Sequence, residues 1–212
     1  MNTESSMVGI GGLGGLEVRG FLEKLGAKVP APGGGAAACV TGATGAAIAK
    51  MVVEYSIGKK NLGAHQGALE LAREELIRFQ EVFLELADED AAAYGMVNEL
   101  SKLAVDDPRR VSEWPAASAA AVAIPRAALA AACDLLRLVE TLPGITNRHL
   151  RSDLAIAGIL GEAAAKSAWW NVSVNLTLVE DAADRSRVQH EGEAACADAA
   201  ARRGRVERAC EG

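Results

Sequence analysis

The sequence predicts an all-α protein, and three observations lead to this prediction. Half of the 212 residues are hydrophobic but only 4% are aromatic, so the core must be built from alanine, leucine, valine and isoleucine. Alanine, the strongest helix former, dominates several long stretches. The alternation of β-branched and polar residues that is typical of strands is nearly absent. We therefore expect a single-domain bundle of six or seven mostly antiparallel helices over residues 16–212.

The N-terminal part of the chain is predicted to contain a leader, a short helix and a glycine-rich loop. Residues 1–15 are rich in glycine and are expected to form a flexible leader. An amphipathic helix is expected at about residues 16–25, with Gly26 as its C-cap. Gly33–Gly35 then open a long apolar helix at about 36–57. Because glycine has no Cβ, a ligand or another backbone can approach here, and a helix start attracts anions; tight packing explains the glycines equally well.

A third helix, at about residues 64–103, carries the clearest pattern in the sequence. Apolar residues recur at seven-residue intervals in two rows that are three residues apart. The rows are Leu69, Leu76, Phe83 and Val97, and Ala72, Phe79, Leu86, Ala93 and Leu100. Asp90 takes the place of an apolar residue in the first row. A carboxylate there is costly unless it is hydrogen-bonded or lines a wet cavity, so Asp90 either fixes helix register or is a working group with a shifted pKa.

The second half of the chain is predicted to form three further helical segments. Asp107 is a good N-cap for a long helix, in which Pro115 and Pro125 are expected to cause a kink or a restart. Another long helix is expected at about residues 150–179. Residues 181–212 are rich in charged residues and alanine and are expected to form a helix on the exterior.

Three polar side chains of the helix at 150–179 are candidates for chemistry. Asp153 lies at the start of this helix, where an N-terminal capping role is the simpler explanation. Asn171 and Asn175 lie one turn apart, and such a pair either reads the edge of an amide or pyrimidinone ring or joins neighbouring helices. Asp153 and Asn171 share a helix face but are separated by about 27 Å at ~1.5 Å per residue. A ligand that contacts both must be extended, or a partner subunit must be involved.

Charge and cysteine usage exclude several classes of function. The net charge is −6, and no basic stripe for nucleic-acid binding is present. The four cysteines are far apart without metal-ligand spacing, so no metal site is expected and a cytoplasmic location suits them. No membrane span or signal peptide is expected. Lys59 and Lys60 follow a helix C-terminus, which the helix dipole explains; their sharper interpretation is a cationic site for a ligand with several carboxylates.

Four segments of the chain, taken in order over residues 18–180, resemble the cyclodeaminase/cyclohydrolase family of folate one-carbon metabolism. The segments are FLEKLGAKVPAPGGGAAACVTGATGAAIAKMV with SIGKKN, then ADEDAAAY, then IPRAALAAAC, and finally SDLAIAG with NVSVNL. The resemblance implies an all-helical, obligately dimeric fold that acts on the carbon bridging N5 and N10 of tetrahydrofolate. It implies either cyclisation of 5-formimino-tetrahydrofolate with loss of ammonia or hydrolysis of 5,10-methenyl-tetrahydrofolate to the 10-formyl form. No metal or redox cofactor is implied.

The resemblance also implies roles for the candidate residues. Asp90 and Asp153 match aspartates of two family motifs and are expected to move protons to and from nitrogen or water. The other candidates are expected to bind the substrate. The three glycines Gly33, Gly34 and Gly35 admit it close to the backbone, Asn171 and Asn175 hold the pterin, and Lys59 and Lys60 meet the glutamate tail.

Some departures from the family pattern bear on activity. Ala36 stands where the family often has serine, Asn61 and Leu62 replace the more usual lysine and tyrosine, and the C-terminal 30 residues match poorly. No formiminotransferase segment is attached, which favours the hydrolytic reaction. The competing interpretation is a non-catalytic helical homodimer that serves as a scaffold or binds a folate-like ligand without turnover.

Overall fold

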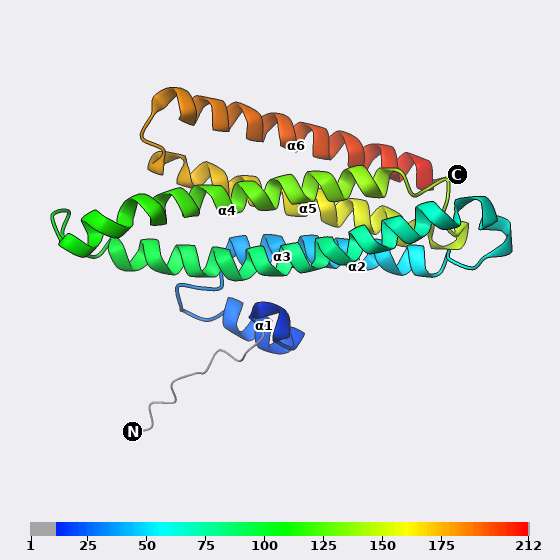
Figure 1. Ribbon diagram of the computed structural model, residues 1–212, viewed down its shortest axis with the longest axis horizontal. Helices are drawn as coiled ribbons and strands as arrows, with labels where there is room; N and C mark the ends of the chain where they lie inside the picture. Colours follow the sequence, from blue (N-terminus) through cyan, green and yellow to red (C-terminus); the bar gives the residue numbers. More distant parts are fainter. Residues whose placement is uncertain (1–11, 212) are drawn as a thin grey trace, which may run out of the picture.

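The computed structural model describes residues 12–211, and within this range it contains helices and no strand. Four long antiparallel helices form a bundle, in which each packs against the next and the last closes against the first. They are α2 (Gly34–Glu54), α3 (Gln66–Leu100), α4 (Pro108–Glu140) and α5 (Arg151–Asn175). A further long helix, α6 (Ala182–Cys210), covers α4 and α5, while the short α1 (Val18–Leu25) lies beside the bundle (Figure 1). The prediction of an all-α fold is confirmed.

Short 3₁₀ segments precede or connect several of these helices. They are η1 (Leu13–Gly15), η2 (Lys60–His65), η3 (Arg148–Leu150) and η4 (Leu176–Leu178). Most of the predicted leader, residues 1–11, lies outside the described residues. The backbone N–H of Leu13 donates to Asp88 of α3 at 2.6 Å. The described end of the leader therefore contacts the bundle.

Small residues let the core helices approach closely. The two apolar rows predicted for α3 are buried, apart from Phe79 and Val97, which are partly buried. Phe83 is fully buried against α2, where a Cβ added at Gly42 would lie 2.6 Å from the ring. An alanine-rich α2 with glycine at this position accommodates a phenylalanine that a larger side chain would displace.

Helix α4 runs without interruption through both of its internal prolines, so the restart expected there is wrong. Its start is as predicted, because the Asp107 carboxylate caps it by accepting from the backbone N–H of Arg109 at 2.9 Å. Pro125 has no N–H for the carbonyl of Ala121, one turn before it. The side-chain amide of Asn175, at the end of α5, donates to that carbonyl at 2.7 Å. A side chain from a neighbouring helix thus replaces the backbone hydrogen bond that proline removes.

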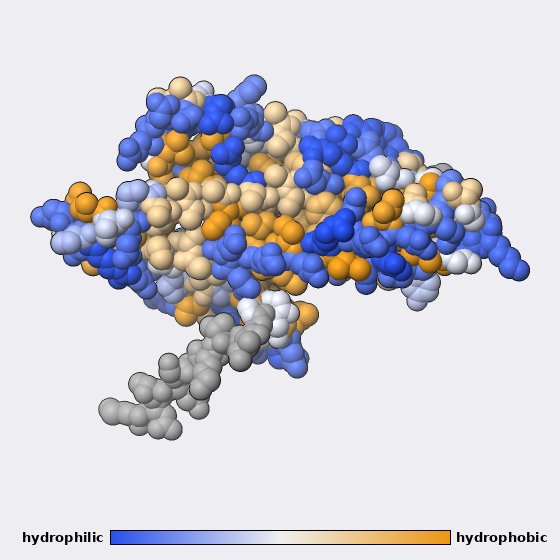
Figure 2. All heavy atoms as spheres, viewed as in Figure 1, coloured by the Kyte–Doolittle hydropathy of each residue, from blue (hydrophilic) through white to orange (hydrophobic). Residues whose placement is uncertain are grey.

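Two helices of the bundle are long and apolar enough to cross a membrane when only length and composition are considered. These are α2 and α4, and 56% and 50% of their most apolar windows are buried inside the protein. Core helices of bundles meet the same criterion, so this is weak evidence for a span. Figure 2 shows apolar atoms along the middle of the bundle over α4, with hydrophilic atoms on α6 and towards both ends.

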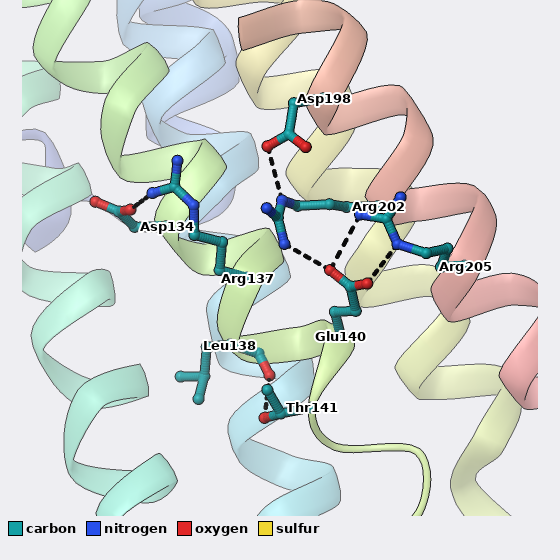
Figure 3. Close-up of polar contacts among 8 residues, drawn as sticks. All are labelled: Asp134, Arg137, Leu138, Glu140, Thr141, Asp198, Arg202 and Arg205. Carbon is teal, nitrogen blue, oxygen red and sulfur yellow. Dashed lines mark hydrogen bonds and ion pairs between the residues drawn. The ribbon is translucent and has the colours of Figure 1, made fainter.

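Ion pairs attach α6 to the bundle. Glu140, at the end of α4, accepts from Arg202 at 2.6 Å and from Arg205, and Arg202 also donates to Asp198 at 2.7 Å (Figure 3). The hydrogen bonds from Arg205 and Arg202 lower the pKa of the Glu140 carboxyl group. On the α5 side, Arg203 donates to Glu162 at 2.8 Å. The helix predicted on the exterior is therefore held to both of its neighbours by charge as well as by apolar contact.

The link between Asn175 and Ala121 predicts a rescue between two substitutions. Asn175→Ala leaves a buried carbonyl without a partner and is expected to cost about 1–3 kcal/mol of unfolding free energy in urea titrations. In a Pro125→Ala background the new backbone N–H serves that carbonyl, so the same substitution should cost less than about 0.5 kcal/mol. Equal losses in the two backgrounds would show that the hydrogen bond does not matter.

Candidate functional site

A pocket with a volume of about 280 Å³ opens where the start of α2 meets α3, the middle of α4 and the end of α5. It brings together six residues predicted to act at the site, which are Gly33, Gly34, Gly35, Asp90, Asn171 and Asn175. Its apolar walls come mainly from Val97, Ile124 and Val174, and Tyr94 also lines it. The pocket is thus an apolar cleft with a few convergent polar groups, which is typical of small-molecule sites.

The carboxyl group of Asp90 lies against the backbone of Gly35. A Cβ added at Gly35 would overlap this carboxyl group, so only glycine allows the contact. The backbone N–H of Ala36, in the first turn of α2, hydrogen-bonds to the carboxyl group. Residues near a helix start have free N–H groups, and a carboxylate is stabilised there. Glycine in this loop therefore allows the carboxyl group of Asp90 to lie at the start of α2.

Two opposing effects act on the proton affinity of Asp90. Burial removes water from the carboxylate and raises the pKa, while the hydrogen bond from Ala36 lowers it; burial is the larger effect, and the pKa is raised. An exposed aspartate is almost entirely ionised at neutral pH. The environment of Asp90 brings its protonated form closer to working pH, which suits a group that both accepts and donates a proton.

The nearby thiol of Cys39 is not a nucleophile in this environment. It is buried one turn along α2, and burial, together with the charge of Asp90, raises its pKa to about 12. A thiol of this kind stays protonated at neutral pH, and reactivity requires the thiolate. Among residues 12–211 no group of three or more His, Cys, Asp and Glu side chains could hold a metal ion. Asp90 is the carboxyl group that lines this pocket and can move protons there.

Both carboxamides of α5 turn their nitrogens towards backbone carbonyls. Asn171 donates to the carbonyl of Ser167 at 2.9 Å, and Asn175 donates to that of Ala121 at 2.7 Å. The Asn171 oxygen lies towards Gly34, where it would be 3.7 Å from an added Cβ. Asn175 therefore joins helices, in agreement with one of the two interpretations of the asparagine pair, and it also lines the pocket.

Three other predicted residues, Asp153, Lys59 and Lys60, lie at the opposite end of the bundle. Helices α2 and α5 are antiparallel, since the start of α2 adjoins Asn171 whereas Ser56, after the end of α2, accepts from the backbone N–H of Asn147 at 2.8 Å. The lysines follow that end of α2, and Asp153 is in the first turn of α5. A helix of this length spans about 30 Å. A single chain does not bring these residues to the pocket of Asp90.

The remaining wall of the pocket contains residues that the sequence patterns did not identify. Tyr94 lies one turn after Asp90 on α3 and lines the same pocket. Its spacing of four residues from Asp90 was a usable signal, because such positions share a helix face. Ile124 and Val174 had no signal of this kind, since nothing local distinguishes them from other apolar residues.

Comparisons with known proteins agree with this geometry. Residues 17–194 match the family model described as formiminotransferase-cyclodeaminase. The chain is 29% identical over 194 residues to a methenyltetrahydrofolate cyclohydrolase of Methylorubrum extorquens, covering 88% of this chain and 91% of that protein. It is 28% identical over 177 residues, 82% of its length, to the formimidoyltransferase-cyclodeaminase of Mus musculus. It spans only 33% of that longer relative.

The fold has a close counterpart among solved structures. The crystal structure of formiminotetrahydrofolate cyclodeaminase from Thermotoga maritima matches with a TM-score of 0.84 and 26% identity. The match covers 92% of this chain and 96% of that one. The residues of the family match include every residue that lines the pocket of Asp90. The resemblance noted in the sequence is confirmed, and the chain belongs to the formiminotransferase-cyclodeaminase family.

Proposed function

We propose that this protein acts on the carbon bridging N5 and N10 of tetrahydrofolate. The reaction is hydrolysis of 5,10-methenyl-tetrahydrofolate to the 10-formyl form, or cyclisation of 5-formimino-tetrahydrofolate with release of ammonia. The observation that carries the proposal is the partly buried Asp90 carboxyl group, seated at the start of α2 inside a pocket. The cyclohydrolase that is matched along 91% of its length supports hydrolysis as the first reaction to assay.

In hydrolysis, Asp90 has two successive tasks. Its carboxylate attracts the cationic methenyl bridge and accepts a proton from the water that attacks the bridging carbon. The protonated carboxyl group then donates to N5 as the bond between this carbon and N5 breaks, which leaves the formyl group on N10. In cyclisation, N10 attacks the carbon of the protonated formimino group and passes its proton to the Asp90 carboxylate. Asp90 then returns this proton to the amine, so that the bond between the carbon and the amine breaks and ammonia leaves. Neither reaction changes an oxidation state, so neither requires a redox cofactor.

The proposal includes a homodimer in which a partner subunit completes the site. Asp153, Lys59 and Lys60 lie about 30 Å from Asp90 along the bundle. A second copy packed antiparallel against α2 and α5 would bring its own copies of these three residues to the pocket. The partner's aspartate would then share proton transfer, and its lysines would meet the carboxylates of the glutamate tail.

The surface of α2 and α5 supports this arrangement. Exposed large apolar side chains lie at helical spacing on both helices, with Met51 and the C-cap Tyr55 at the end of α2 and Ile156, Ile159, Trp170 and Val174 on α5. Trp170 and Val174 are each 64% exposed and lie at the pocket end, while Tyr55 is 61% exposed at the opposite end. Exposed large apolar residues on two helices that pack against each other are typical of an interface, and a two-fold axis there would pair each end of the bundle with the other.

The first test is the loss of activity in Asp90→Asn. The wild-type protein is expected to accelerate the decay of methenyl-tetrahydrofolate absorbance or the release of ammonia from formimino-tetrahydrofolate, and Asp90→Asn should lower kcat by about 10²–10⁴-fold. Because only the ionised form accepts a proton, the kcat of hydrolysis should fall as pH drops through the raised pKa of Asp90, and the variant should lose this dependence. Asp88→Asn, which keeps an acceptor for the N–H of Leu13, is the control.

Two outcomes of this test contradict the proposal. If the wild-type protein accelerates neither reaction over buffer, the non-catalytic homodimer is the better account. If Asp90→Asn and Asp88→Asn both keep the full rate, the protein is an enzyme whose proton transfer is carried by another group.

The second test concerns the position of the Asp90 carboxyl group against the backbone of Gly35. Gly35→Ala introduces a Cβ that overlaps the carboxyl group and should displace it from the N–H of Ala36. We expect kcat to fall by about 10²-fold, because displacements of about 1 Å have this effect at catalytic groups. Gly34→Ala has 3.7 Å of clearance to Asn171 and should alter KM more than kcat. Equal kcat in Gly35→Ala and the wild type would show that the position of the carboxyl group is not critical.

The third test asks whether one site contains residues of two subunits. Asp90→Asn and Asp153→Asn are each expected to be inactive as purified homodimers. When they are unfolded and refolded together in equal amounts, half of the dimers are mixed, and each mixed dimer has one site with both aspartates. Activity should therefore recover to about 25% of the wild-type value. Mixed dimers that form by mass spectrometry but remain inactive would place the two aspartates in separate sites.

A further inference from the structure

The amides of α5 have fixed orientations. A carbonyl oxygen accepts hydrogen bonds and cannot donate them, so the atoms that approach the carbonyls of Ser167 and Ala121 must be the amide nitrogens of Asn171 and Asn175. The oxygen of each amide is at the opposite corner and has no hydrogen-bond donor within the described part of the chain. Neither oxygen is a buried atom without a partner, so both are accessible to solvent, and both residues line the pocket. The α5 side of the pocket therefore presents acceptors.

Pro125 is the reason that Asn175 holds this orientation. Ala121 is a buried residue, and its carbonyl lacks the usual donor of its own helix, because position 125 has no N–H. A buried carbonyl without a donor costs about 1–3 kcal/mol, so the amide nitrogen of Asn175 is held there and its oxygen cannot exchange places with it. Asn175 is in this sense a positioned acceptor, and the proline inside α4 is what positions it.

The α2 side of the pocket has the opposite character. Gly33 caps α2 without a side chain, and the first-turn N–H groups of Gly34 and Gly35 have no partner within their own helix. Ala36, next to them, donates to Asp90. Donors therefore line the start of α2, acceptors line the end of α5, and the proton-transfer group lies on the donor side.

A pterin ring has hydrogen-bonding groups in the matching order. Its 2-amino group and N3–H are donors, the adjacent O4 is an acceptor, and N5 is the neighbour of O4 across the ring fusion. We propose that the oxygens of Asn171 and Asn175 accept from the 2-amino group and N3–H, which turns O4 towards the first turn of α2 and N5 towards Asp90. This assignment rests on the proposed function, and it adds the orientation of the substrate and the group that α5 selects.

The assignment makes Asn171→Asp and Asn171→Leu behave differently. Aspartate keeps an acceptor oxygen but loses the hydrogen bond to the carbonyl of Ser167, whereas leucine has a similar size and loses both the acceptor and that hydrogen bond. The probe is 5-formyl-tetrahydrofolate, whose one-carbon group is uncharged, and Kd is measured by calorimetry. We expect the leucine variant to bind at least about tenfold more weakly and the aspartate variant to stay within about threefold of the wild type. Gln189→Leu, an exposed amide replaced on α6, is the control and should bind like the wild type.

A ligand analogue tests the same contact from the other side. The 2-desamino form of the probe should bind the wild type at least about tenfold more weakly than the parent, and this ratio should shrink in Asn171→Leu, where the contact is already lost. Circular dichroism of each variant shows whether α5 is intact, and Asn171→Asp serves as the second variant should the leucine variant not fold.

The outcomes separate this assignment from the proposed function. Equal affinity of the wild type for the parent and the desamino probe, or equal weakening by Asp and Leu at position 171, overturns the assignment; turnover of methenyl-tetrahydrofolate by the same preparation would leave the proposed function standing. A wild-type protein that neither binds nor converts any folate overturns both.

Discussion

The contact between the Asp90 carboxyl group and the backbone of Gly35 is the constraint on which the site depends. It requires α3 to approach the first turn of α2 without an intervening side chain, and it excludes every residue but glycine at position 35. The same approach removes water from Asp90 and supplies the N–H of Ala36, so the shift in pKa and the hydrogen bond that limits it have one structural origin. The packing of α3 on α2 and the proton affinity of Asp90 therefore have one structural cause, and a change in one changes the other.

Helix α2 is approached closely by α3 at more than one position. At the pocket, a backbone carbonyl of α4 also depends on a hydrogen-bond donor from another helix. Gly42 accommodates Phe83 in the same way that Gly35 accommodates Asp90, which keeps α2 and α3 together over several turns. On the other side, Pro125 leaves a carbonyl of α4 without its helical donor, and Asn175 supplies one from α5. The pocket thus lies among helices whose backbones are near to one another and to polar side chains. Such sites fix the orientation of a ligand because few of their groups can rotate.

Regular patterns in the sequence predicted the bundle and the position of Asp90, because helical periodicity is local information. A carboxylate inside an apolar row is visible from spacing alone, and this marks Asp90 as a candidate. The position of Asp153 relative to Asp90 was not accessible in this way, because the antiparallel order of α2 and α5 decides which ends meet. The expected restart at Pro125 was wrong because it, too, depends on a neighbouring helix. The missing hydrogen bond is replaced by Asn175 from a different helix, and single-helix rules do not include such a partner.

Helix α6 is attached to the bundle without contributing to the pocket of Asp90. The family match ends at residue 194, inside α6, and α6 supplies no residue to the pocket of Asp90. Beyond that point Arg202 and Arg203 pair with Glu140 and Glu162 on helices α4 and α5. Ion pairs at a partly exposed surface tolerate substitution, since each contributes little alone and alternatives are easily found. The bundle around Asp90 has no such freedom, because an added methyl group at position 35 already overlaps the carboxyl group.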